Sequence, residues 1–314
     1  MVSTKEGKWM QGGAIETRAL TKSFDGELAV DHLDLFVPEG SVFGLMGPNG
    51  AGKTTLIRML MGILRPTSGR GTVLGREIAD PSGEARQQVG YVADVQHMYP
   101  SFKVEEILNY CARVYRNWDW KRCRTLLKTF QLPTGKLVRA LSKGMKTQLA
   151  LVIALAIRPR LLILDEPAGG LDPVVRRHFM QLIVQEAATG NTTVFFSTHN
   201  LHDLERTADH VAVIMKGKLL FSRPLDELKA GSRKIQAVFP EGLPEEIGNL
   251  PGIVRVEAQG KVYSLIVGEN FDETLERVKF FRPVFLELLD LDLEEIFIHT
   301  MAKEGYSREA LVLE

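Results

Sequence analysis

The chain has 314 residues, 39 basic and 39 acidic side chains, and a hydrophobic fraction of 45%. This length suits one large domain or a domain with a smaller one, and this apolar fraction is ordinary for a globular core. The formal net charge of zero gives no global argument for binding nucleic acid or a charged membrane surface.

The N-terminal segment and the apolar stretches predict neither a secreted protein nor a membrane-spanning segment. Residues 1–13 are polar and lack the apolar stretch of a signal peptide. The longest apolar stretch, Leu149–Ile157, is too short to cross a bilayer. Cys111 and Cys123 lack metal-ligand spacing and fit a reducing compartment. Any membrane role is therefore expected to come through a partner.

The first part of the chain predicts two strands, 14–20 and 28–37, joined by a turn at 21–26. The apolar run 42–46 is typical of a buried parallel strand. Apolar residues then recur at helical spacing, and they are Leu56, Met59, Leu60 and Ile63.

A phosphate-binding pattern stands between that strand and that helix. The segment Gly47-Pro48-Asn49-Gly50-Ala51-Gly52-Lys53-Thr54 fits G-x-x-x-x-G-K-[ST] at every required position. Its glycines let backbone N–H groups turn toward a phosphate, and the helix N-terminus adds positive potential. Lys53 is expected to bridge the outer phosphates and the Thr54 hydroxyl to hold Mg²⁺.

The middle of the chain predicts a helical insert between two parts of the sheet. A turn at 66–69 and short strands at 71–74 and 89–92 come first. Residues 101–145 then show two amphipathic helical stretches, and we predict that they form a helical subdomain. Core packing is the favoured role for the aromatic side chains in and beside it, and a partner surface is the alternative.

Beyond the insert, helices and strands alternate again. Ser142 is a good N-cap for a helix that runs to Ile157. The apolar strand 161–164 ends at Asp165 and Glu166, and the strand 192–196 is followed shortly by His199. The remaining predicted elements are helices 174–188 and 201–208 and strands 211–215 and 219–221.

The C-terminal part predicts a small α+β domain. We place a linker at 231–233, and divide the chain into domains 1–230 and 231–314. Alternating residues and a Gln259-Gly260 link predict a hairpin, and Leu275 and Val278 lie on a predicted helix. Asp292 followed by Glu295 resembles a capping box that opens a helix at 293–300.

Together these elements predict an α/β fold, a mostly parallel sheet with helices packed on it. Ligand groups then gather at the carboxyl ends of the strands. Asp165 is expected to hold Mg²⁺, and Glu166 to orient and polarise the attacking water. Alone, the two acids could be structural and His199 merely packed or solvated, but their order after the phosphate loop favours a site.

Five motifs occur here in the order used by the ATP-binding subunits of ABC transporters, and the resemblance covers roughly residues 14–225. The motifs are 47–55 (which ends at Thr55), Leu141–Met145, Asp165-Glu166-Pro167, Gly170-Leu171-Asp172 and His199. The segments 141–146, 117–120 and 292–297 further resemble the bacitracin and antibiotic export branch. The resemblance implies a P-loop ABC ATPase cassette that binds ATP and Mg²⁺.

The resemblance also implies a head-to-tail dimer, either a homodimer or a pseudo-dimer. Each site then combines the phosphate loop of one copy with Ser142-Lys143-Gly144 of the other. Phe24 would stack on adenine, His199 would contact the γ-phosphate, and Asp172 would couple the two sites. The implied partner is an integral membrane permease on a separate chain, which would hold this protein on the cytoplasmic face of the membrane.

Two positions depart from the family pattern. Lys143 and Met145 stand where the commonest signature has glycine and glutamine, and Asp94 stands where the family normally has glutamine. Gln96 lies two residues further on. Asp94 and Gln96 are both candidate Mg²⁺ ligands, and we expect Asp94 to face away from the nucleotide while Gln96 or a water completes the metal shell.

The resulting function is an ATP-hydrolysing subunit that drives a separate membrane protein, expected to be an exporter. Lys53, Glu166 and His199 are the expected catalytic residues. The alternative of a soluble ABC ATPase acting on ribosomes or DNA is less favoured, because the chain has one phosphate loop and no heptads. A nucleotide-binding regulator without turnover is disfavoured by Glu166 and His199.

Overall fold

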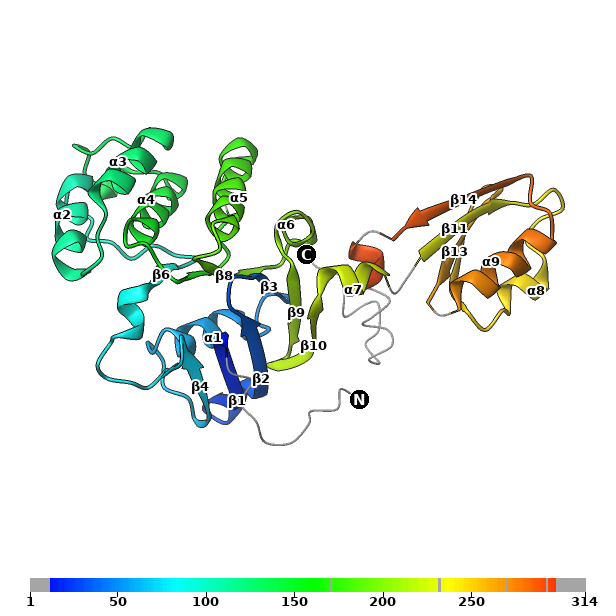
Figure 1. Ribbon diagram of the computed structural model, residues 1–314, viewed down its shortest axis with the longest axis horizontal. Coiled ribbons are helices and arrows are strands. Elements are labelled where there is room, and N and C mark those ends of the chain that lie inside the picture. Colours follow the sequence, from blue (N-terminus) through cyan, green and yellow to red (C-terminus); the bar gives the residue numbers. More distant parts are fainter. Residues whose placement is uncertain (1–11, 170, 231–232, 269, 292, 298–314) are drawn as a thin grey trace. The chain divides into compact units, whose positions relative to one another are not determined.

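The computed structural model describes residues 12–169, 171–230, 233–268, 270–291 and 293–297 (Figure 1). Contacts within the chain divide it into two compact units, Met1–Ser222 and Arg223–Glu314. The first unit contains two sheets, the second contains one, and each unit has its own core. In the described part of the chain, no helix is long and apolar enough to cross a membrane.

The first unit contains an antiparallel sheet in the order β2-β1-β4-β5. Its strands are β1 (Gly13–Phe24), β2 (Glu27–Pro38), β4 (Ser68–Val73) and β5 (Arg76–Glu77).

A second, six-stranded sheet has the order β10-β9-β3-β8-β7-β6. The pairs β9/β3, β3/β8, β8/β7 and β7/β6 are parallel. The strands are β3 (Val42–Met46), β6 (Val89–Val92), β7 (Leu161–Leu164), β8 (Thr193–Thr198), β9 (His210–Met215) and β10 (Lys218–Pro224).

Helices separate these sheets and cover the six-stranded one. The helices before residue 223 are α1 (Lys53–Leu60), η1 (Ala85–Gln88), α2 (Val104–Val114), α3 (Trp120–Thr129), η2 (Val138–Ala140), α4 (Lys143–Ala156), α5 (Pro173–Ala188) and α6 (Leu201–Thr207).

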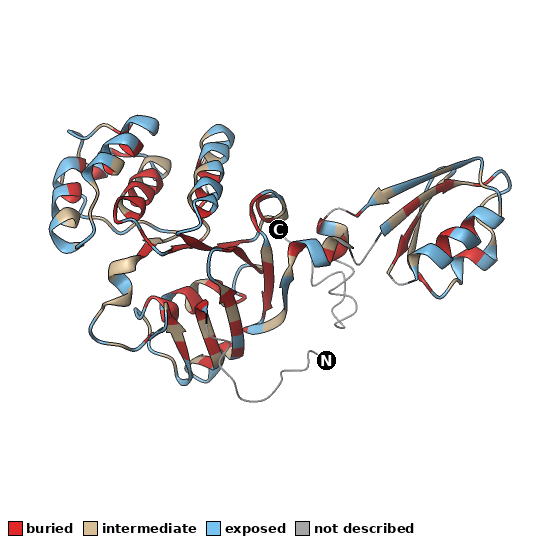
Figure 2. Ribbon diagram, viewed as in Figure 1, coloured by how far each residue is buried: buried red, intermediate tan, exposed pale blue. Residues whose placement is uncertain are grey.

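The alternation of side chains in β3 explains this layering. Phe43 and Leu45 belong to the core that α1 shares with both sheets. Gly44 faces the other side, where a Cβ atom would come within 2.0 Å of Leu204 on α6. Figure 2 shows strands β3, β6, β7, β8 and β9 coloured almost entirely as buried, whereas the edge strand β10 has no buried residue. A parallel sheet covered on both faces needs such continuous apolar runs.

The second unit is an antiparallel sheet with helices on one face. The strand order is β12-β13-β11-β14, and Ile235, Ala237, Leu265 and Val278 are among its buried core residues. Residues 293–297 are helical. The other elements are α7 (Leu225–Ala230), β11 (Arg233–Val238), α8 (Glu245–Gly248), β12 (Ile253–Gln259), β13 (Val262–Val267), α9 (Phe271–Phe280) and β14 (Phe285–Asp290).

Several local predictions are wrong. The predicted turn 21–26 is strand as far as Phe24, and only Asp25 and Gly26, both with positive φ, form the turn. The hairpin turn is Gly260-Lys261 instead of Gln259-Gly260. Ile63 lies beyond the end of α1. Arg233 of the predicted linker is the first residue of β11, while residues 231–232 and Asp292 of the predicted capping box lie outside the described residues.

Candidate functional site

The phosphate loop is a tight turn between β3 and α1. Gly52, which immediately precedes α1, has a φ of 105°, in the left-handed region that favours glycine. A Cβ atom there would come within 2.3 Å of the Ala29 carbonyl oxygen, and one at Gly47 within 2.4 Å of that of Ile214. Only glycine therefore suits these two positions, and the loop brings the start of α1 to the end of β3.

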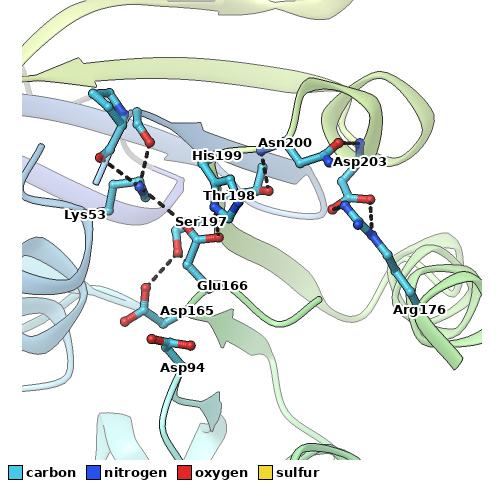
Figure 3. Close-up of polar contacts among 12 residues, drawn as sticks. Lys53, Asp94, Asp165, Glu166, Arg176, Ser197, Thr198, His199, Asn200 and Asp203 are labelled. Carbon is cyan, nitrogen blue, oxygen red and sulfur yellow. Dashed lines mark hydrogen bonds and ion pairs between the residues drawn. The ribbon is translucent and has the colours of Figure 1, made fainter. Parts of the chain in front are cut away.

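Lys53 is buried inside this loop. Its Nζ donates to the carbonyl oxygens of Gly47 and Pro48 at 2.6 and 3.1 Å. The same Nζ lies 3.1 Å from Glu166 Oε1, and the lysine side chain is only 6% exposed (Figure 3). The buried Lys53 ammonium thus lies at the carboxyl edge of the sheet, where it would face phosphate oxygens.

The two acids that follow β7 are tied to β8 by one serine. The Ser197 hydroxyl donates to Asp165 Oδ1 at 2.7 Å and accepts from the Glu166 backbone N–H at 2.9 Å. Glu166 has a φ of 47°, which is rare for a side chain of this size. Such strain is typical of functional sites whose surroundings fix the backbone.

Burial dominates the electrostatics of Asp165. It raises the pKa of Asp165 above the usual value, while hydrogen bonds from Ser197 and Thr54 oppose that shift. The negative charges of Glu166 and Asp94 raise the pKa further. The carboxylate therefore lies in a setting that a bound cation would stabilise.

His199 completes the contacts of Glu166. Its Nδ1 lies 2.8 Å from Glu166 Oε2, so the two carboxylate oxygens face Lys53 on one side and His199 on the other. The imidazole is 47% exposed, whereas the Glu166 side chain is 15% exposed. The predicted catalytic residues are thus in direct contact, as Figure 3 shows.

Asp94 is close to this group. Figure 3 shows its carboxylate directed toward Asp165, and its charge acts on the pKa of Asp165. Its Oδ1 also lies 3.8 Å from Lys143 Nζ. Asp94 therefore lies near both Asp165 and Lys143, and its orientation relative to the nucleotide stays a prediction. The Gln96 amide instead donates to the Ala93 carbonyl within its own segment.

The remaining predicted residues sit at element ends. Ser142 caps α4 by accepting from the Met145 N–H at 3.2 Å, and it is exposed together with Lys143. Asp172 caps α5. Phe24 is 47% exposed, with the Lys22 ammonium 5.0 Å from its ring centre. Among the described residues, no hydrogen bond or ion pair joins Ser142, Phe24 or Asp172 to the Lys53–Glu166 pair.

The donor set fits a magnesium–nucleotide complex. The Thr54 hydroxyl is close enough to Asp165 to lower the pKa of that carboxyl, and both groups are oxygen ligands of the kind that Mg²⁺ prefers. The described residues contain no group of three His, Cys, Asp or Glu side chains that could hold a metal alone. Mg²⁺ usually keeps waters and takes phosphate oxygens beside one or two protein ligands, which suits this pair.

Sequence reasoning missed two parts of the site. Ser197, which links both acids, is a common residue at a strand end and carries no motif of its own. The ion pair between Arg176 on α5 and Asp203 on α6 joins side chains 27 positions apart. Nothing in their separate local patterns predicts that they meet.

A family model described as ABC transporter matches residues 30–169. A second model, for an AAA domain, matches residues 137–202. The first match covers the phosphate loop, the insert, the signature segment and the acidic pair. The first match therefore includes Lys53, Asp165 and Glu166, whereas Ser197 and His199 lie beyond its end and within the second match.

The chain is similar to the ABC transporter ATP-binding protein YtrB of Bacillus subtilis. The two are 32% identical over 294 residues, covering 94% of this chain and 99% of that protein. The bacitracin transport ATP-binding protein BcrA of Bacillus licheniformis is 39% identical over 222 residues, covering 70% and 72% of the two chains.

Solved structures show the same fold. An ATP-binding subunit of an ABC transporter has a TM-score of 0.65 and 27% identity, covering 69% of this chain and 92% of that one. The dimeric post-hydrolysis state of the cassette MJ0796, bound to ADP and Pi, has a TM-score of 0.61 and 22% identity over 67% and 98% of the chains. The chain belongs to the ATP-binding subunits of ABC transporters.

Proposed function

We propose that this chain binds ATP with Mg²⁺ at the phosphate loop and hydrolyses it with Glu166 to drive a separate membrane protein. The main support for this proposal is the position of the Glu166 carboxylate, which lies 3.1 Å from Lys53 Nζ and 2.8 Å from His199 Nδ1. These groups can bind phosphate charge, accept a proton from water and orient the reacting end of the nucleotide.

Each residue then has a distinct task. The Lys53 ammonium neutralises the outer phosphates, and Glu166 orients the attacking water and takes up its proton. His199 holds Glu166 and presents its exposed side to the γ-phosphate. Thr54 and Asp165 hold Mg²⁺, which would stabilise the charge that develops on the phosphate oxygens.

A second copy would complete the site. Ser142 and Lys143 are exposed at the first turn of α4, a helix of 14 residues whose N-terminus favours anions. The cassette MJ0796, which shares the fold, was solved as a dimer. We propose that the α4 N-terminus of one copy faces the phosphates bound by the other, with Asp172 and Phe24 at the shared site.

The names of two relatives support a membrane partner. BcrA is named for bacitracin transport, and YtrB is named as an ABC transporter ATP-binding protein. We propose an integral permease on a separate chain, an export direction, and a place on the cytoplasmic face of the membrane. Co-purification of a membrane protein with the full chain would support this part.

The test of the nucleotide site is Lys53→Ala. The variant should lose ATPase activity and bind a fluorescent ATP analogue at least about tenfold more weakly, because the main positive charge at the phosphates is removed. Lys128→Ala, an exposed lysine on α3, is the matched control and should behave as wild type. Near-normal turnover in folded Lys53→Ala would show that the loop is not the active site.

A further inference from the structure

The ion pair between Arg176 and Asp203 joins two helices that begin at the site. Arg176 Nε and one terminal nitrogen donate to the two oxygens of Asp203, at 3.0 and 2.5 Å. The Asp203 side chain is 8% exposed and that of Arg176 is 32% exposed. Two parallel hydrogen bonds fix both the distance and the orientation of the two side chains.

One end of this pair leads to the Asp172 segment. The Asp172 carboxylate caps α5 by accepting from the N–H groups of Val174 and Val175 at 3.1 and 3.0 Å. The Arg176 N–H donates to the Asp172 carbonyl at 2.9 Å. Arg176 therefore lies one helical turn from Asp172, and its position is fixed by the same first turn.

The other end leads to His199. Asn200 caps α6 by accepting from the N–H groups of His202 and Asp203. The Asn200 N–H donates in turn to the Thr198 hydroxyl at 3.0 Å. His199, which contacts Glu166, is thus held between the end of β8 and the first turn of α6 (Figure 3).

We infer that Arg176 and Asp203 are positioning residues that fix the His199 segment against the Asp172 segment, so that His199 stays in reach of Glu166. This inference rests on the proposed function. A buried ion pair is weak evidence for stability, because desolvation offsets much of its attraction. A bidentate pair is instead well suited to fix the first turns of two helices, and the segments that precede them, in one relative position.

The test removes both charges at once, so that no buried charge is left without its partner. Arg176→Met/Asp203→Leu should bind a fluorescent ATP analogue with nearly wild-type affinity and keep a similar KM for ATP. Its kcat should fall about tenfold, because a small misplacement of His199 and Glu166 weakens the chemical step. Arg176→Lys, which keeps the charge but not the fork, should recover part of that loss.

The chain offers a matched control pair. Arg158 donates from Nε and a terminal nitrogen to Asp119 Oδ2 at 2.9 and 2.7 Å, without touching the His199 segment. Arg158→Met/Asp119→Asn removes that pair while asparagine can still cap α3. The control should keep wild-type kcat even if its melting temperature falls.

A second readout does not depend on turnover. The imidazole NMR resonances of His199 should shift in the Arg176→Met/Asp203→Leu variant and stay unchanged in the control. Wild-type kcat and unshifted His199 resonances in that variant would overturn the inference. Loss of nucleotide binding by the wild-type protein would instead count against the proposed function, because the His199 resonances report on the ion pair without nucleotide.

Discussion

Glu166 is held by three residues from two distant parts of the chain. Its backbone N–H meets Ser197, and its carboxylate meets Lys53 and His199. Because its φ lies in the left-handed region, these contacts also have to offset a local backbone strain. The pair of acids at the end of a predicted strand indicates the chemical role of Glu166. The role of Ser197 in fixing Glu166 becomes evident only from the pairing of β7 with β8.

Asp94 adds a third negative charge beside Asp165 and Glu166. Since a carboxylate attracts Mg²⁺, Asp94→Asn should raise the Mg²⁺ concentration for half-maximal nucleotide binding. We expect a three- to tenfold rise, about the effect of a Coulomb energy near 1 kcal/mol. Gln96→Ala should have less effect, because that amide is bonded within its own segment.

Titrating Mg²⁺ against binding of a fluorescent ATP analogue measures this difference. Glu105→Gln, an exposed acid on α2, serves as the charge control and should leave the midpoint unchanged. A large rise in Gln96→Ala together with no change in Asp94→Asn would contradict the placement of Asp94 at the metal site.

At the scale of helices and strands, the apolar runs were the most informative part of the sequence. The predicted strands 42–46, 89–92 and 161–164 coincide with β3, β6 and β7. Each is buried in a parallel sheet, where a continuous apolar run leaves little ambiguity. The predicted Ser142 cap is confirmed, because its hydroxyl accepts from the N–H of Met145, three residues on, and needs no distant contact.

Elements that depend on distant partners were missed. β14 is not predicted from the sequence, because apolar and polar side chains do not alternate along Phe285–Asp290, and the segment gains its strand geometry by pairing with β11. β5 has only two residues, too few for any periodic signal. The Arg176–Asp203 pair cannot be predicted from the sequence either, because only the packing of α5 against α6 brings the two side chains together.

The whole chain consists of two units with separate cores. We propose that residues 1–230 form the ATP-binding domain, with a helical subdomain at 101–145, and 231–314 an accessory domain. A chain cut after Ala230 keeps all of β10 and should fold and bind the ATP analogue within about twofold of the full chain, since every site residue lies upstream. Circular dichroism and binding titration check this, and loss of folding would make the C-terminal unit part of the core.

We propose that two copies of this chain share ATP between the phosphate loop of one and the α4 N-terminus of the other. Glu166→Gln keeps the shape of the side chain but cannot take up a proton, so it should bind ATP and hydrolyse it very slowly. Static light scattering of this variant with ATP and Mg²⁺ should show a doubling of mass. The same variant carrying Ser142→Arg should remain monomeric, because the bulky cation disrupts the first turn of α4. A strictly monomeric Glu166→Gln protein at high concentration, with ATP bound, would contradict the shared site.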